Sequence, residues 1–171
     1  MNLLLERIPS PVGLLLAVSE DGALRALDFE GYESRMQRLL RLHYGSVDLV
    51  PTDPSGRFRR AFQAYFDGDF TAFDEVEVRT GGTEFQRSVW AELRRIKPGT
   101  TISYGQLAAR IGSPSASRAV GLANGSNPVA IVVPCHRVIG ANGSLTGFGG
   151  GLERKRWLLA HETGSRDLFQ A

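Results

Sequence analysis

Cysteine, lysine and long apolar runs are scarce in this sequence of 171 residues. The single cysteine excludes an internal disulfide and cannot by itself build a zinc site. No run approaches the roughly 18 apolar residues of a membrane span, and Glu6 and Arg7 interrupt the N-terminus too early for a signal peptide. We therefore expect a cytoplasmic protein without a membrane partner.

Charge is distributed unevenly along the chain, although the net formal charge is only +2. The first 80 residues carry 9 Lys and Arg against 13 Asp and Glu, and the remaining residues carry 11 against 5. Because Lys97 and Lys155 are the only lysines, arginine supplies nearly all the positive charge. A basic half of this kind favours a polyanionic partner, and a charged surface without a partner is the alternative.

The N-terminal half predicts strands first and helices afterwards. Turn signals separate three alternating apolar runs: Leu3–Ile8, Gly13–Val18 and Ala23–Phe29. Apolar residues at helical spacing then predict helices over residues 32–44 and 55–66. The Gly-Gly pair at 81–82 marks the expected boundary between two domains, residues 1–81 and 82–171. The predicted fold class is α+β, with a small antiparallel sheet and helices in the first domain.

The C-terminal half predicts a mostly helical, winged-helix-like domain. Thr83 and Gln86 have the spacing of a capping box at a helix start. Two short helical segments, YGQLAARI and ASRAVGLANG, are joined by the turn GSPS. This arrangement is typical of a helix-turn-helix, although helix pairs that bind no DNA are also common.

The second of these segments has an unusually thin face. Ser117, Gly121 and Gly125 recur every four residues, and each glycine inside a helix costs about 1 kcal/mol relative to alanine. Small residues permit close approach either to another helix or to a nucleic-acid groove, and periodicity alone weighs these two readings equally. Arg118 lies beside the face and could reach into a duplex.

The only cysteine lies in the segment VVPCHRVIG. A lone cysteine is usually a small buried hydrophobe, but here His136 offers a base and Arg137 a positive charge, both of which favour a thiolate. Because adjacent side chains of extended backbone point to opposite faces, Cys135 and His136 would need a bridging water. A carboxylate that orients the imidazole would come from a short list in the basic half: Glu84, Glu92, Glu153, Glu162 and Asp167.

The segments RAVGLANGSNPVAIV, PCHRVIG and TGFGGGLERKRWLLAHE together resemble the O6-alkylguanine-DNA alkyltransferase family, the methylated-DNA–protein-cysteine methyltransferases. The resemblance is dense from Gly82 to Glu162 and extends over the N-terminal half only in outline. It implies that Cys135 accepts the alkyl group, that His136 deprotonates it through water and that Glu162 orients His136. It further implies that Tyr104 donates a proton to the departing guanine.

The resemblance also implies the remaining contacts of the site. Asn127 would support the turn before the cysteine, and the main-chain carbonyls of Cys135 and Val138 would read the guanine amino group. The loop 147–151 would wall the pocket through Phe148, with a backbone amide of Gly149 or Gly150 near O6. Arg118 would fill the gap left in the base stack, and the other expected DNA-binding residues are Ser113, Ser117, Gly121, Gly125 and Gln86.

The implied activity is DNA repair by direct reversal. The alkyl group of O6-alkylguanine, or of O4-alkylthymine, would pass irreversibly to Cys135 in a single turnover, after base flipping through the minor groove. The expected partner is double-stranded DNA with alkylated bases, bound by a monomer, and the chemistry requires neither a cofactor nor a metal. Two alternatives differ in their consequences: a non-catalytic helix-turn-helix regulator would not need Cys135, and a cysteine hydrolase or acyltransferase would turn over esters or peptides.

Overall fold

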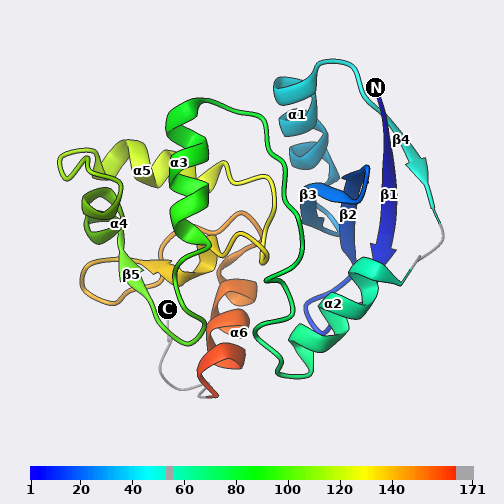
Figure 1. Cartoon of the computed structure of the whole chain (residues 1–171). Helices are drawn as coiled ribbons and strands as arrows, with labels where there is room; N and C mark the ends of the chain where they lie inside the picture. The colour runs from blue at the N-terminus through cyan, green and yellow to red at the C-terminus, as the bar shows by residue number, and fades with distance from the viewer. Residues whose placement is uncertain (53–55, 165–171) are drawn as a thin grey trace. The chain divides into compact units, whose positions relative to one another are not determined.

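The computed structural model describes residues 1–52 and 56–164 and has the expected α+β class (Figure 1). Its contacts group into two compact units. Unit 1 comprises Met1–Gly82 together with Pro128–Val132, and unit 2 comprises Thr83–Asn127 together with the chain from Val133 onward. The short segment Pro128–Val132 therefore lies with the N-terminal residues, whereas the sequence assigned it to the second domain.

Unit 1 is built on a four-stranded sheet with the order β3-β2-β1-β4. The three predicted strands are present as β1 (Asn2–Ile8), β2 (Leu15–Glu20) and β3 (Ala23–Phe29), in antiparallel sequence. A fourth strand, β4 (Asp48–Pro51), pairs parallel with β1 and was not predicted. It is short, largely exposed and ends in proline, so it lacks the apolar alternation that identifies a half-buried strand.

Helix α1 (Glu33–Tyr44) packs on this sheet, and helix α2 (Arg57–Phe66) packs on an aromatic residue outside it. From α1, Met36 and Leu40 pack on a cluster that alternate strand positions supply: Leu3, Leu5, Leu16, Val18 and Ala26. From α2, Phe62 and Tyr65 each contact the Phe73 ring at 4.9 Å between centroids. Residue 55, the expected start of this second helix, lies outside the described residues.

Unit 2 consists of short helices around a minimal sheet. Its helices are α3 (Glu84–Leu93), α4 (Tyr104–Arg110), α5 (Ser117–Gly125) and α6 (Leu152–Thr163), with the 3-10 turn η1 (Cys135–Arg137). Strand β5 (Ile102–Ser103) pairs parallel with β6 (Val138–Ile139). The predicted capping box begins α3: Thr83 Oγ1 accepts from the Gln86 amide at 3.1 Å, and Gln86 Oε1 accepts from the Thr83 amide at 2.9 Å.

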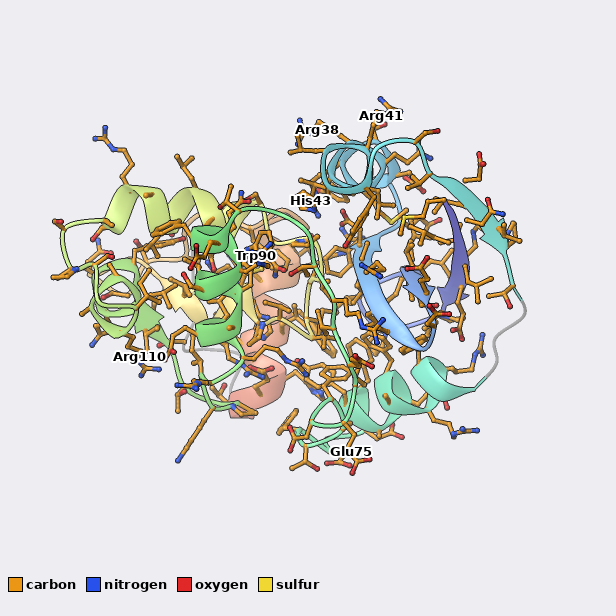
Figure 2. All side chains as sticks on the ribbon, turned by 45° about the horizontal axis from the view of Figure 1, so that its top comes forward. Arg38, Arg41, His43, Glu75, Trp90 and Arg110 are labelled. Atoms are coloured by element: carbon orange, nitrogen blue, oxygen red, sulfur yellow. The ribbon has the colours of Figure 1, made fainter. Side chains whose placement is uncertain are left out.

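The elements of the predicted helix-turn-helix, α4 and α5, contact each other and α3. Trp90, labelled in Figure 2, donates its indole N–H to the Ala123 carbonyl at 2.8 Å and so ties α3 to α5. Within residues 1–52 and 56–164, none of the helices has the length and apolar character of a membrane span.

Candidate active site

Cys135 is the first residue of η1 and is only 7% exposed. Asparagines hold the backbone on both sides of it. Asn127 Nδ2 donates to the Val133 carbonyl at 2.8 Å, and the same carbonyl accepts the Cys135 amide at 2.8 Å. Asn124 Nδ2 donates to the Cys135 carbonyl at 3.4 Å. The end of α5 therefore fixes the turn that carries the thiol.

The two residues that follow Cys135 form a buried hydrogen-bonded network with Glu162. His136 Nε2 lies 3.0 Å from Glu162 Oε2, and both side chains are fully buried. Arg137 donates to both oxygens of the same carboxylate, at 2.9 and 2.8 Å, and also to the Ile96 carbonyl at 2.6 Å. Glu162 is thus shared by a histidine and an arginine, and the positive charge of Arg137 is neutralised by Glu162 rather than directed only at the thiol.

The electrostatics of this network fix the protonation state of the imidazole. Burial lowers the pKa of His136, and the charges of Arg137 and Lys155 lower it further, against an opposing effect of Glu162. Burial alone would raise the pKa of Glu162, but the neighbouring His136 and Arg137 bring it well below its usual range. At neutral pH, His136 is consequently neutral and Glu162 is ionised.

These protonation states identify the basic atom of His136. An ionised carboxylate can only accept hydrogen bonds, so Nε2 must carry the hydrogen that Glu162 accepts. A neutral imidazole then leaves Nδ1 with a free lone pair. Nδ1 is buried and makes no hydrogen bond with any described residue. It is therefore placed to accept a proton, directly or through a water, from a neighbouring donor.

Lys155, on α6, is a third buried charged residue of the site and is fully buried. Its ammonium donates to the carbonyls of Val138 and Thr146, each at 2.7 Å, and lies 3.5 Å from the Gly147 carbonyl. Burial lowers the pKa of Lys155 to about 8, and its interaction with Cys135 opposes that decrease. Lys155 thus clamps β6 to the following loop and places a positive charge within electrostatic range of the thiol.

Tyr104 is the first residue of α4 and meets the same loop. Its hydroxyl lies 2.9 Å from Thr146 Oγ1, while the main chain of Thr146 accepts from Lys155. Ser103 and Gln106 form a capping box that fixes this helix start. The Tyr104 hydroxyl is therefore held by its place at the start of α4 and by Thr146, whose carbonyl accepts from Lys155 of α6.

The remaining expected pocket residues lie on that loop and on β6. Phe148 and Gly149 are partly exposed and Gly150 is buried. The Val138 carbonyl accepts from Lys155, and the Cys135 carbonyl accepts from Asn124 and from the Val138 amide. Since a carbonyl has two lone pairs, the Val138 carbonyl keeps room for one further donor, whereas the Cys135 carbonyl already accepts from two.

The thin face of α5 is divided between two environments. Ser117 and Gly121 face α4: an added Cβ on Gly121 would lie 3.8 Å from the Tyr104 ring, and one on Gly105 would lie 3.8 Å from Ser117 Oγ. An added Cβ on Gly125 would meet nothing within 4 Å. The helix–helix reading therefore applies to Ser117 and Gly121, and the solvent-facing side is a different set, namely Arg118, Ala119, Leu122 and Gly125.

Two other expected DNA-binding residues are mainly engaged within unit 2. Gln86 closes the capping box of α3, and its Nε2 lies 3.4 Å from Ser126 Oγ. Ser113 is partly exposed in the turn between α4 and α5, where its amide donates to the Ala108 carbonyl at 2.9 Å. Among the described residues, no side-chain hydrogen bond joins Gln86 or Ser113 to the exposed residues Arg118, Ala119, Leu122 and Gly125 of α5.

Sequence reasoning missed Lys155, Asn124 and the double pairing of Glu162 with Arg137. A signal for Lys155 existed, because positions 155, 159 and 162 share one face of a helix. A lysine on the same face as the proposed orienting glutamate could have been expected to be buried beside it. No comparable signal exists for Arg137, whose partners Ile96 and Glu162 are distant in sequence.

Comparisons with known proteins agree on one family. Residues 84–164 match the family described as 6-O-methylguanine DNA methyltransferase, DNA binding domain. The chain is 51% identical over 166 residues to a methylated-DNA–protein-cysteine methyltransferase of Salmonella typhimurium, covering 95% of this chain and 96% of that protein. It is 47% identical over 169 residues to a protein of the same name from Mycolicibacterium paratuberculosis, with the same coverage of both chains. The crystal structure of Mycobacterium tuberculosis OGT in complex with DNA superposes with a TM-score of 0.81 at 44% identity, over 94% of this chain and 93% of that chain.

Proposed function

The chain belongs to the methylated-DNA–protein-cysteine methyltransferase family, and we propose that it repairs DNA by transferring the alkyl group of O6-alkylguanine to Cys135. O4-alkylthymine is the second proposed substrate. The observation that carries this proposal is the buried pair of His136 Nε2 and Glu162 Oε2, 3.0 Å apart. His136 directly follows the only cysteine of the sequence. This pair supplies a neutral imidazole base where a thiol must be activated.

The first chemical step is the activation of Cys135. His136 Nδ1 takes the thiol proton through a bridging water, and Glu162 stabilises the resulting imidazolium. The positive charge of Lys155 favours the thiolate over the thiol. A thiolate is a soft nucleophile, which suits attack on a saturated carbon.

The second step is the displacement itself. A bond forms between the Cys135 sulfur and the alkyl carbon, while the bond between that carbon and O6 of guanine breaks. The electron pair of the broken bond remains on the base, and a proton from Tyr104 neutralises it. The carbonyl of Val138, the wall at Phe148 and a backbone amide of Gly149 or Gly150 hold the base during the transfer.

The product explains why the protein would act once. The alkylated cysteine is a thioether, which water does not cleave under mild conditions, and Cys135 is the only thiol in the sequence. One molecule of protein is consumed for each alkyl group removed. The proposed chemistry draws on the residues of this chain alone, in a monomer that acts in the reducing cytoplasm.

DNA engagement is assigned to unit 2, within the proposed domain 82–171. The matched DNA-binding family and the DNA complex of the Mycobacterium tuberculosis protein support double-stranded DNA as the partner. A base inside a duplex must be flipped out to reach a buried thiol, which costs a few kcal/mol. We assign Arg118 to the gap left in the stack and Asn127 to the support of the turn between α5 and Cys135.

Stoichiometry tests this function. The protein is titrated against duplex DNA that contains one O6-methylguanine, and restored guanine is counted by chromatography of the digested DNA. The expected result is a plateau at one guanine per protein molecule, and none with Cys135→Ser. Restoration of many guanines per molecule, or activity that survives Cys135→Ser, would refute the proposal.

A further inference from the structure

Leu122 is an apolar side chain in an unexpected place. It lies in the middle of α5 and is 72% exposed, on the side of the helix opposite the buried Val120, Ala123 and Asn124. Arg118 precedes it by four residues, so the two side chains are neighbours on the same helix face. The side chain of Leu122 lies largely outside the packing of unit 2 and is therefore accessible to a partner.

The surroundings of Leu122 are small. Ala119 and Gly125 share its face, and Gly121 is turned toward Tyr104. Gly125 is the last residue of α5, and nothing lies within 4 Å of a Cβ added to it. Leu122 consequently stands above a low surface that a partner can approach closely.

Another helix carries the same pair in different surroundings. On α1, Arg38 and Leu42 also lie four residues apart, and Leu42 is 74% exposed. Three residues before Leu42, α1 carries Leu39 where α5 carries the smaller Ala119, and Figure 2 shows Arg38 and Arg41 projecting outward from α1. The pair on α5 therefore differs from the pair on α1 by the smaller residue beside its leucine.

We propose that Leu122 is an apolar wedge that enters the minor groove beside Arg118 and helps to open the base stack at the lesion. The occupant of this face is duplex DNA, for two reasons: an exposed arginine stands one turn away, and α5 lies inside the matched DNA-binding family, residues 84–164. Minor-groove proteins that unstack bases use leucine and similar residues in this way. The inference rests on the proposed function, since it assigns a second groove contact to the same helix.

Leucine and arginine would contribute to DNA binding by different forces. Arginine neutralises a phosphate or enters the stack as a cation, so its contribution decreases with salt concentration. Leucine buries apolar surface against deoxyribose and base edges, and that contribution does not release counterions. The two contributions can therefore be separated by the dependence of affinity on salt.

The experiment compares Leu122→Ala with Leu42→Ala, its matched control on α1. Fluorescence anisotropy measures binding to a duplex with one O6-methylguanine, in the Cys135→Ser background so that no lesion is consumed. Removal of the buried methyl groups is expected to weaken binding about tenfold in Leu122→Ala, with an unchanged slope of log affinity against log salt. Leu42→Ala is expected to bind as the unmodified background does, and Leu122→Met to regain most of the loss.

Three outcomes would overturn the proposal: equal binding by Leu122→Ala and Leu42→Ala, a loss in Leu122→Ala that comes with a changed salt slope, or a change in oligomeric state without a change in DNA affinity. Thermal unfolding curves establish that each variant is folded. A wild-type protein that binds duplex DNA but transfers no alkyl group would refute the proposed function, and the binding result for Leu122 would still decide this inference.

Discussion

The two functional regions of unit 2 are built in opposite ways. Around Cys135, the neutral imidazole of His136 and the charged side chains of Arg137, Lys155 and Glu162 are all buried, and each makes hydrogen bonds that the fold provides. On α5, the outer face carries one exposed cation, Arg118, and one exposed leucine, Leu122, above small residues. The polar groups of the first region find their partners within the chain, and for the second region we propose DNA as the partner.

This difference fits the proposed roles of the two regions, which are catalysis around Cys135 and DNA recognition on α5. A buried network holds its groups in one geometry before the substrate arrives, which is what efficient proton transfer requires. An exposed face costs the fold little and is free to adapt to DNA. Substitutions in the buried region should therefore alter both stability and chemistry, and substitutions on the exposed face of α5 should alter DNA binding alone.

The largest effect is expected from Glu162→Gln. The amide would leave the buried guanidinium of Arg137 without its ion pair, and loss of one partner of a buried pair costs about 3–5 kcal/mol. The imidazole would also lose the carboxylate that stabilises its charged form, so the rate of alkyl transfer should decrease by about 100-fold or more. Urea unfolding and rapid-quench kinetics measure the two effects.

Glu153→Gln is the matched control for this change, because Glu153 is an exposed residue of the same helix, α6. It should leave stability and rate within error of the wild type. A Glu162→Gln protein as stable and as reactive as Glu153→Gln would show that the buried pair does not organise the site.

The next largest effect is expected from substitution of Lys155, and Lys97 provides the matched control. Lys155 is fully buried and Lys97 is exposed. Lys155→Met should lower the free energy of unfolding by about 1–3 kcal/mol, because buried carbonyls lose their donor, and should slow alkyl transfer through the loss of positive charge near the thiol. Lys97→Met should change neither quantity in the same urea and rapid-quench assays. Equal stability and equal transfer rates in the two variants would contradict the role of Lys155 in the site.

Arg118→Ala is expected to act on DNA binding and not on stability. Removing one cationic contact should reduce the slope of log affinity against log salt by about 1, and weaker binding should be most evident at low salt. Anisotropy titrations at several salt concentrations measure the slope, and urea unfolding should match the wild type. A salt slope that stays unchanged would contradict the assignment of Arg118 to the duplex.

The smallest effect is a dependence of stability on pH. The folded-state pKa of His136 is below its unfolded value, so below about pH 6.5 the unfolded chain binds a proton that the folded chain resists. Stability should therefore decrease as pH falls from 7 to 5.5, by at most about 1.4 kcal/mol per pH unit for this group.

His43, in unit 1, also has a pKa that burial lowers, so it contributes with the same sign. Urea unfolding of His136→Gln and of His43→Gln separates the two contributions. The His43→Gln protein should keep the part due to His136, and a pH dependence that disappears entirely with His43→Gln would contradict the neutral, buried state of His136.

Local patterns in the sequence predicted much of the fold. Turn residues and alternation located β1 to β3, and the capping pair Thr83 and Gln86 located the start of α3. Nonlocal features escaped prediction: β4 pairs with β1 across more than forty residues of chain and is too exposed to show a pattern. Helical periodicity also grouped Ser117, Gly121 and Gly125 but could not indicate that α4 covers the first two.

The candidate site also divides into features that local sequence patterns indicate and features that depend on tertiary packing. The motif PCHRV and the distant Glu162 could be proposed from resemblance, since short motifs preserve residue types at fixed positions. The burial of Lys155 and the sharing of Glu162 with Arg137 depend on how α6 packs against η1, which no local pattern determines. The sequence therefore indicates candidate reacting residues, whereas the residues that hold them in place depend on tertiary packing.

Peptide mass after reaction tests the central claim most directly. The protein is incubated with duplex DNA containing O6-methylguanine, digested with a protease and analysed by tandem mass spectrometry. Methyl transfer to the thiol predicts one added methyl group, located on Cys135, in a fraction of molecules equal to the fraction of lesions repaired. Repaired DNA together with an unmodified Cys135 peptide would contradict the mechanism.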